Sequence, residues 1–270
     1  MSDDLIVTAY VVIDETLRAL GHRSHGLAQV SDAEVLTVAV VAAKYFANNH
    51  ERALGVLRGM RYLTKPLSAS RFNRRLHALG DWLHLLVETL GELFAQGEAF
   101  VLDSMPVPVC RRARARRSRK LSGQAFCGYC AAKREKFFGW RLHLICTTGG
   151  IPVAFDLVPG ALHDLTPIHE LTYGLPAGST VYADKAYNAG ADEATILAEA
   201  GVRLVPLRKA NMRPNDWADK LALRAYRKRI ETLYSQLAAM GIQRLHARTN
   251  RGVELKTHAT LLAATLTNAD

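Results

Sequence analysis

The sequence lacks any apolar run long enough to cross a bilayer, which excludes a protein built from membrane-spanning helices. The longest run, from Val35 to Phe46, is interrupted by Lys44, whereas a spanning helix needs about 20 consecutive apolar residues. The chain begins Met-Ser-Asp-Asp, and a secretory signal begins with basic residues instead. We therefore expect a cytoplasmic protein that has no membrane partner.

Cysteine is scarce as well, with four residues among 270, and this excludes a disulfide-stabilised fold. Cys127 and Cys130 have the spacing of a zinc knuckle, but a structural zinc site needs a second closely spaced pair. Cys110 and Cys146 stand alone, so we expect four reduced thiols. Low-complexity tracts are absent, and the length allows one large domain or two smaller ones.

A surplus of acidic residues is also missing, because the formal net charge is +10. Residues 1–95 hold ten Lys or Arg and ten Asp or Glu, so the whole surplus lies after them. Seven of the ten residues from Arg111 to Lys120 are cationic. Neither a helix nor a strand buries such a run, which therefore predicts an exposed arm. Nucleic acid is the commonest partner of a basic patch, and a merely solubilising charge run is the alternative.

The N-terminal third of the chain predicts a helical domain. Ser31 and Glu34 form a capping box in front of an apolar helix. Further helices are expected over 51–58, 69–79 and 82–94. The second of these presents a polar and basic face made of Arg71, Asn73, Arg74 and Arg75. A helix, a turn with proline and a basic helix fit a helix-turn-helix reader of DNA, and a helical bundle with solvated arginines is the alternative.

The stretch around Asp103 predicts a short buried strand that ends in a carboxylate. Residues Phe100–Leu102 are too few for a helix and rich in strand formers. Pro106 and Pro108 lack the N–H that a central strand needs, so we expect regular pairing to end near Met105. A turn-forming role is the alternative for Asp103, since Asp favours turns on local grounds.

A β-hairpin is predicted after the basic arm. Residues 139–147 alternate between apolar and polar side chains, two glycines form the turn, and 151–158 make the return strand. His143 lies on this hairpin, where we expect a core or supporting group, not a metal ligand.

The segment 179–183 repeats the design of the first strand, because β-branched and aromatic residues again lead to a carboxylate, Asp184. It follows a predicted helix over 165–173 that Asp164 is expected to cap. A helix, a strand and a long helix over 217–240 come next. This order of elements predicts an α/β fold.

Three carboxylates in this order suggest a divalent-metal site. Asp103 and Asp184 end strands, and Glu231 lies on a helix that can pack against the sheet. Converging carboxylates repel one another without a cation, and Mg²⁺ prefers such hard oxygen ligands. Two Mg²⁺ ions about 3.5–4 Å apart activate an attacking oxygen and stabilise a leaving one in phosphoryl transfer. An ordinary surface ion pair with Arg227, four residues earlier, is the alternative for Glu231.

The chain resembles the DDE transposases of bacterial insertion sequences, most closely the insertion-sequence 982 family. The resemblance covers most of the chain and rests on the motifs Val101–Cys110, Phe138–His143, His163–Asp164, Tyr182–Tyr187 and Arg227–Glu231. It implies an RNase H-like catalytic domain with a mixed sheet over 96–270, including the arm over 111–120, behind an all-helical domain over 1–95.

The resemblance also implies roles for individual residues. Asp103, Asp184 and Glu231 are expected to be catalytic and to bind two Mg²⁺ ions, which Mn²⁺ can replace. Five neighbours are expected to support them: His143, His163, Asp164, Lys185 and Arg227. DNA is expected to contact Arg111, Arg112, Arg114, Arg116, Arg117, Arg119, Lys120, Lys133, Arg134, Lys136, Arg71, Asn73, Arg74 and Arg75.

The implied activity is metal-dependent cleavage of DNA at insertion-sequence ends, followed by strand transfer into target DNA. At least a homodimer is expected during the reaction, because two ends must be paired. The implied location is the bacterial cytoplasm, in association with the nucleoid. Two alternatives stay open: a nuclease of the same fold that only hydrolyses DNA or RNA, and a non-catalytic DNA-binding regulator derived from a transposase.

Overall fold

The computed structural model describes residues 3–63, 65–117, 121, 123–130, 133–247 and 249–269. Its contacts divide the chain into two compact units, which we describe separately. The helical unit consists of Met1–Thr89 and Gln236–Asp270, and the sheet unit consists of Leu90–Ser235. The end of the chain thus joins the N-terminal helices, whereas the sequence predicts one continuous domain from residue 96 onward.

The helical unit is built around two helices that are buried on nearly every side. Its elements, with the ends of α5 and α8 shared by the sheet unit, are α1 (Asp3–Ala19), α2 (Asp32–Phe46), α3 (His50–Gly59), α4 (Ala69–Ala78), α5 (Gly80–Phe94), η4 (Ile242–Arg244) and α9 (Asn250–Asn268). Helix α2 is buried from Val35 to Ala43 and α9 from Thr257 to Leu266. Because helices that are apolar all round need partners on every side, α9 packs against α2.

Local signals set the ends of the N-terminal helices. The predicted capping box is confirmed: Ser31 Oγ accepts the N–H of Glu34 at 3.1 Å, and Glu34 Oε2 accepts the N–H of Ser31 at 2.6 Å. The connection between α3 and α4 runs from Met60 to Ser68. It is longer than the turn of about 3–4 residues in a helix-turn-helix, which favours the bundle alternative.

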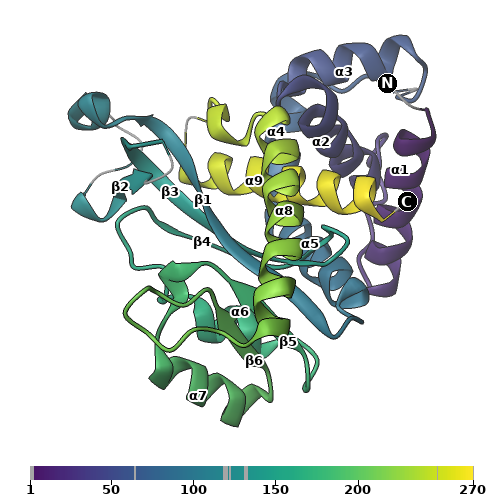
Figure 1. The fold of residues 1–270 in the computed structure, drawn as a ribbon. Coiled ribbons are helices and arrows are strands. Elements are labelled where there is room, and N and C mark those ends of the chain that lie inside the picture. The colour runs from purple at the N-terminus through teal and green to yellow at the C-terminus, as the bar shows by residue number, and fades with distance from the viewer. Residues whose placement is uncertain are drawn as a thin grey trace. The chain divides into compact units, whose positions relative to one another are not determined.

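The sheet unit is a mixed α/β fold, as predicted. Its elements are β1 (Ala99–Arg111), η1 (Arg112–Arg117), η2 (Gln124–Phe126), β2 (Cys127–Cys130), β3 (Glu135–Thr147), β4 (Pro152–Pro159), α6 (Ile168–Tyr173), β5 (Thr180–Ala183), η3 (Lys185–Tyr187), α7 (Gly190–Ala200), β6 (Arg203–Pro206) and α8 (Trp217–Ala239). Within the described residues the sheet has six strands in the order β2-β3-β1-β5-β6, with β4 paired to β3 (Figure 1).

Strand direction identifies the core of this sheet. Strand β3 is antiparallel to β1 and to β4, while β1, β5 and β6 are parallel to one another. If the short β2 is set aside, the strands lie in the chain order third, second, first, fourth and fifth, and the second alone runs in reverse. This is the strand order of an RNase H-like core, as the resemblance implies.

The first strand is longer than predicted. Pairing with β3 continues through Pro106↔Arg141 and Pro108↔Gly139 to Arg111, so the expected end near Met105 is wrong. The reason is that β5 pairs with β1 through Leu102 and no further in the described residues. Beyond that point one side of β1 is an edge, where a proline without an N–H is tolerated.

The core of the sheet unit lies on the face that α6 and α7 cover. Phe100 and Leu102 of β1 are fully buried there beside Val181 of β5, and Ile168 and Ile196 of the two helices pack on them. Each large apolar side chain that is fully buried stabilises the fold by about 1.5–3 kcal/mol. The strand that carries Asp103 is therefore anchored immediately before that residue. None of the described helices is both long and apolar enough to span a membrane.

Candidate active site

Backbone register brings two of the predicted carboxylates to one place. Strands β1 and β5 are parallel, and Leu102↔Ala183 is the last pair of their ladder. Asp103 and Asp184 are the next residue on each strand. Because paired strands lie about 4.8 Å apart, both side chains begin from neighbouring positions at the carboxyl edge of the sheet. Ligands in open α/β sheets bind at this edge.

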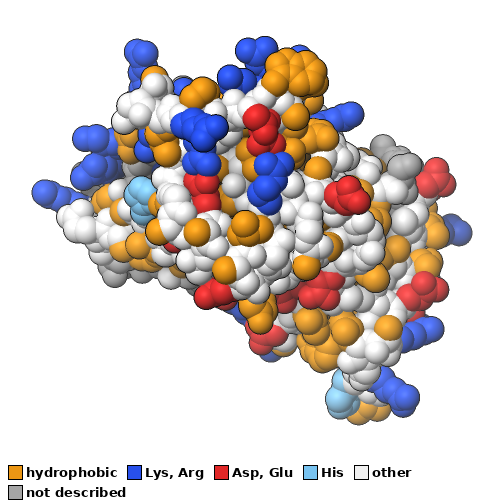
Figure 2. All heavy atoms as spheres, turned by 60° about the horizontal axis from the view of Figure 1, so that its bottom comes forward, with side chains coloured by type: hydrophobic (Ala, Val, Ile, Leu, Met, Phe, Trp, Pro, Cys, Tyr) orange, Lys and Arg blue, Asp and Glu red, His pale blue; other side chains and the backbone are white. Residues whose placement is uncertain are grey.

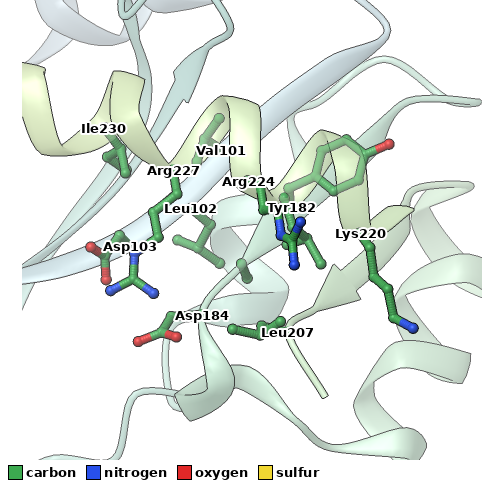
Figure 3. A pocket seen from close by; sticks show the side chains of 12 residues that line it. Val101, Leu102, Asp103, Tyr182, Asp184, Leu207, Lys220, Arg224, Arg227 and Ile230 are labelled. Carbon is green, nitrogen blue, oxygen red and sulfur yellow. The ribbon is translucent and has the colours of Figure 1, made fainter. Parts of the chain in front are cut away.

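The two aspartates share the wall of a cavity of about 320 Å³. Apolar side chains, among them Leu102 and Leu207, line it together with residues of α8. Figure 3 shows Lys220, Arg224 and Arg227 on that helix, with Arg227 beside the carboxylates of Asp103 and Asp184. The other lining residues are Val101, Tyr182, Ala183, Leu223 and Ile230. The lining of the cavity thus combines apolar side chains with two carboxylates and three cations.

Burial destabilises the charged form of Asp103 in this position. Its burial is the main cause that raises its pKa to about 7, and the charges of Asp184 and Asp164 act in the same direction. The N–H of Ser104, which donates to Asp103 Oδ1 at 2.7 Å, opposes the shift. Asp184 is also half-buried, and its Oδ1 accepts the N–H of Lys185 at 2.6 Å. A bound cation would favour the charged forms of two neighbouring carboxylates, so the pair is suited to binding one.

Arg227 supplies positive charge at this point. Its guanidinium points toward both Asp103 and Asp184 in Figure 3. Its Nε also donates to Glu231 Oε1 at 2.9 Å, and this hydrogen bond is the main cause that raises the pKa of Arg227, followed by the charges of Asp184, Glu231 and Asp103. Glu231 is therefore connected to the two aspartates through Arg227.

Glu231 itself does not line the cavity. Its side chain is 57% exposed, one residue beyond Ile230, which does line it. Among the residues that the structure describes, no three His, Cys, Asp or Glu side chains lie close enough together to hold a metal ion. The structure thus brings Asp103, Asp184 and Arg227 together and leaves Glu231 on the outer side of the arginine.

A cluster of polar side chains lies next to Asp103 on the sheet. Ser104 Oγ donates to Asp164 Oδ1 at 3.1 Å, and Arg141 Nη1 donates to Ser104 Oγ at 3.3 Å. The guanidinium of Arg141 also lies 3.6 Å from Asp164 Oδ1. Asp164 was predicted to cap a helix, and this is wrong, because α6 begins at Ile168 with Pro167 as its N-cap residue. Its carboxylate instead accepts from the strand residue that follows Asp103.

His143 closes this cluster from the core side. It is fully buried on β3, and its Nδ1 shares a hydrogen bond of 3.0 Å with the hydroxyl of Tyr187. Its Nε2 lies 3.9 Å from Asp164 Oδ1, too far for a hydrogen bond. Burial lowers the pKa of His143 to about 4 against the opposing charge of Asp164. His143 is therefore neutral near pH 7 and supports the cluster through packing and Tyr187.

Two predicted supporting residues lie apart from the cavity. His163 is exposed, and its Nδ1 accepts the N–H of Leu165 at 3.3 Å. The side chain of Lys185 is exposed, while its N–H donates to Asp184. Of these two residues, Lys185 is thus linked to the site through its backbone, and His163 forms a local turn.

The basic arm continues from the same strand as Asp103. Arg111 ends β1, and the backbone of residues 112–117 forms the short helix η1. Seven cations in this region are exposed: Arg111, Arg112, Arg114, Arg116, Lys133, Arg134 and Lys136. Arg119, Lys120 and the side chain of Arg117 lie outside the described residues. In Figure 2, Lys and Arg side chains gather at the left edge of the face shown, where Figure 1 places the end of the β1–β3 ribbon.

The basic helix of the helical unit is split between two roles. Arg71, Asn73 and Arg74 of α4 are exposed. Arg75 instead forms an ion pair with Asp32, and its Nη1 donates to the carbonyl of Val30 at 2.6 Å. Arg75 therefore holds α4 to the start of α2, and three of the four predicted side chains face solvent.

Sequence reasoning predicted Arg227 as a supporting residue but missed the other two cations that line the cavity, Lys220 and Arg224. Lys220 and Arg224 are four residues apart, and Arg227 follows three residues later. Side chains at these spacings share one face of a helix, so the pattern was readable once α8 was predicted. Tyr234 was missed too: its hydroxyl is buried without a hydrogen-bond partner in the described structure, and the charge of Asp103 adds to the burial that raises its pKa. No local pattern in the sequence predicts that Tyr234 is buried near Asp103.

Comparison with known proteins identifies a family. Residues 94–251, more than half of the chain, match the family described as Transposase DDE domain. No curated protein matches the chain. Among solved structures, the Mos1 transposase paired-end complex with left transposon end is similar at 11% identity over 84% of this chain and 86% of that one, with a TM-score of 0.28. A similarity of this size supports no argument about fold or ligand.

Proposed function

Because the chain belongs to the transposase DDE family, we propose that it cuts DNA at the ends of an insertion element and joins the freed 3′ ends to target DNA. The observation that carries this proposal is the meeting of Asp103 and Asp184 in one cavity that Lys220, Arg224 and Arg227 also line. Membership of the insertion-sequence 982 family and a location in the bacterial cytoplasm, at the nucleoid, are parts of the same proposal.

The residues of the cavity fit divalent cations. Asp103 and Asp184 offer hard oxygen ligands, and the pKa of Asp103 is raised mainly by burial and further by the charges of Asp184 and Asp164, which a bound cation would offset. We infer Mg²⁺ as the natural ion, with Mn²⁺ as a substitute. When bound, a pair of such ions supplies activation of the attacking oxygen and stabilisation of the leaving one. Asp103 and Asp184 would bind the ions, and Glu231 would join them after it separates from Arg227.

The cations of α8 have a different task. Lys220, Arg224 and Arg227 line the same cavity as the two aspartates, where they would bind the phosphates on either side of the bond that is cut. Arg227 would turn from the carboxylates to a phosphate oxygen, which leaves Glu231 free. Phosphate contacts of this kind position the DNA and carry no sequence information directly. We propose that the cations of the arm and of α4 hold the remaining DNA, and that a homodimer or larger assembly pairs two ends.

A strand-transfer assay tests this proposal. The probes are duplexes made from the DNA that bounds the reading frame, either intact or already cut to expose a 3′-hydroxyl, together with a supercoiled target plasmid. We expect Mg²⁺-dependent cutting of the intact duplex and joining of the pre-cut duplex to the plasmid. Cutting without joining would favour the nuclease alternative. Binding without either reaction would favour the non-catalytic regulator.

A further inference from the structure

The strand that carries Asp103 also carries the start of the basic arm. Asp103 pairs with Leu144 of β3, and Arg111 pairs with Phe137. The ladder between these pairs is continuous apart from one irregularity between Pro108 and Cys110. The seven steps along β3 at about 3.4 Å each separate the two positions by about 24 Å. Backbone pairing thus fixes the distance between the candidate active site and the arm.

The far end of this ribbon is packed as well as paired. On the outer side of β3, β2 adds the pairs Cys127↔Phe138 and Gly128↔Phe137. The ring of Phe126 meets that of Trp140 edge-on at 5.0 Å. Arg141 Nη2, reaching out from the polar cluster beside Asp103, donates to the carbonyl of Tyr129 at 2.9 Å. A paired ribbon with side-chain contacts on its outer edge resists bending, so the spacing is a structural constant of the sheet unit.

The charge at the far end is of one sign. Between Arg111 and Lys136 the sequence contains a single acidic residue, Glu135. The exposed cations of this end cluster, defined as Arg111, Arg112, Arg114, Arg116, Arg134 and Lys136, surround the last pairs of the ribbon. Six phosphate contacts would give a slope of log affinity against log salt of about −5. Duplex DNA fits this cluster because the same polyanion must reach the cavity.

We propose that the β1–β3 ribbon acts as a spacer that fixes a second DNA contact about seven base pairs from the phosphate that is cut. The inference rests on the proposed function, since that function supplies the DNA. It follows from the distance of about 24 Å and the rise of about 3.4 Å per base pair along a duplex that runs with the ribbon. The end cluster then binds a patch of phosphates separate from the patch held by Lys220 and Arg224.

Phosphate-ethylation interference tests the spacing. The full-length protein binds, in EDTA, a 40-bp duplex made from the DNA that bounds the reading frame, and bound and free duplexes are mapped. We expect two patches of interference with centres about six to eight nucleotides apart. Lys220→Ala/Arg224→Ala should remove the near patch, and Arg112→Ala/Arg114→Ala should remove the far patch and reduce the salt slope by about 2. Lys209→Ala/Arg213→Ala, which removes equal charge from the segment after β6, should leave both patches.

The outcomes separate the spacer from the reaction itself. One patch alone, two patches fewer than four or more than ten nucleotides apart, or a far patch that persists in Arg112→Ala/Arg114→Ala would overturn the spacer. Because the mapping needs no cleavage, its result stands even if the strand-transfer assay detects no reaction. Cutting and joining together with a single patch would retain the transposase and remove the spacer.

Discussion

The sheet edge and helix α8 hold their charged side chains in different ways. Asp103 and Asp184 directly follow the last pair of a strand ladder, so the backbone fixes where both carboxylates begin. Arg227 and Glu231 extend from a helix surface, each more than half exposed, and hold each other. A side chain directly after the last pair of a ladder is placed by the fold, whereas one on an exposed helix face is placed by its current partner. We therefore expect the aspartates to stay in place and the groups of α8 to move when metal and DNA bind.

The largest expected effect is on catalysis. Asp103→Asn, Asp184→Asn and Glu231→Gln should each lower Mg²⁺-dependent DNA cutting at least about 1,000-fold, because each removes a ligand charge worth several kcal/mol. DNA binding should stay within a few-fold of the unmodified protein, since the binding cations are untouched. The measurement is the single-turnover cutting rate beside a DNA-binding isotherm.

Side-chain length makes the comparison sharper. Asp103→Glu should be as inactive as Asp103→Asn, because the backbone of Asp103 is paired to β3 and cannot shift to make room for a longer side chain. Glu231→Asp should keep measurable activity if the helix position adjusts to its ligands. Equal activity of Asp103→Glu and Glu231→Asp would contradict the contrast between side chains that the fold positions and side chains that their partners position. Unchanged cutting by any neutral variant would remove that residue from the proposed triad.

The next effect is on stability and its dependence on pH. The pKa of Asp103 is raised from 3.8 to about 7, so the folded protein binds more protons than the unfolded chain between these values. Stability is therefore lost as pH rises through this window. In EDTA at pH 8, Asp103→Asn should unfold at higher urea concentration, with a gain of about 2–4 kcal/mol that fades toward pH 4. Glu199→Gln on the exposed side of α7 is the control, and an equal gain there would contradict the interpretation.

Local patterns in the sequence were enough for the parts of the site that strands place. A β-branched and aromatic run occurs directly before both Asp103 and Asp184. Parallel pairing of the two strands then brings the two aspartates side by side. The hairpin formed by β3 and β4 was equally readable from alternation and two glycines. These features depend on a residue and its neighbours in the chain, so one sequence contains the necessary information.

Other features depend on what lies beside an element. Pro106 and Pro108 remain part of β1 because the pairing of β5 with β1 ends at Leu102, before both prolines. The sequence of β1 alone does not predict where its partner strand ends. Asp164 faces Ser104 and Arg141 across the sheet unit, although a helix cap explained it locally. The assignment of α9 to the helical unit likewise depends on the apolar surface of α2. Tertiary partners decided each of these cases against the local signal.

A smaller effect concerns competition for the carboxylates. Arg227→Gln removes the guanidinium between Asp103 and Asp184 and releases Glu231, so divalent cations should bind about tenfold more tightly in the absence of DNA. Calorimetric titration with Mn²⁺ measures this change. Arg229→Gln, an exposed arginine of the same helix, is the matched control and should bind Mn²⁺ like the unmodified protein. Weaker binding by Arg227→Gln would mean that the arginine organises the site and does not compete for it.

The smallest expected effect is the contribution of the Arg227–Glu231 pair to stability. Both side chains are more than half exposed, and an exposed pair four residues apart on a helix contributes about 0.3–0.5 kcal/mol at most. Glu231→Gln should therefore shift the urea midpoint in EDTA by an amount close to experimental error, and 1 M salt should remove what remains. This near-zero result distinguishes helix α8 from the sheet edge most directly, because removing one negative charge at Asp103 is expected to change the free energy of unfolding several times more. A large loss in Glu231→Gln would mean that the pair holds α8 in place, and α8 would then belong with the groups that the fold positions.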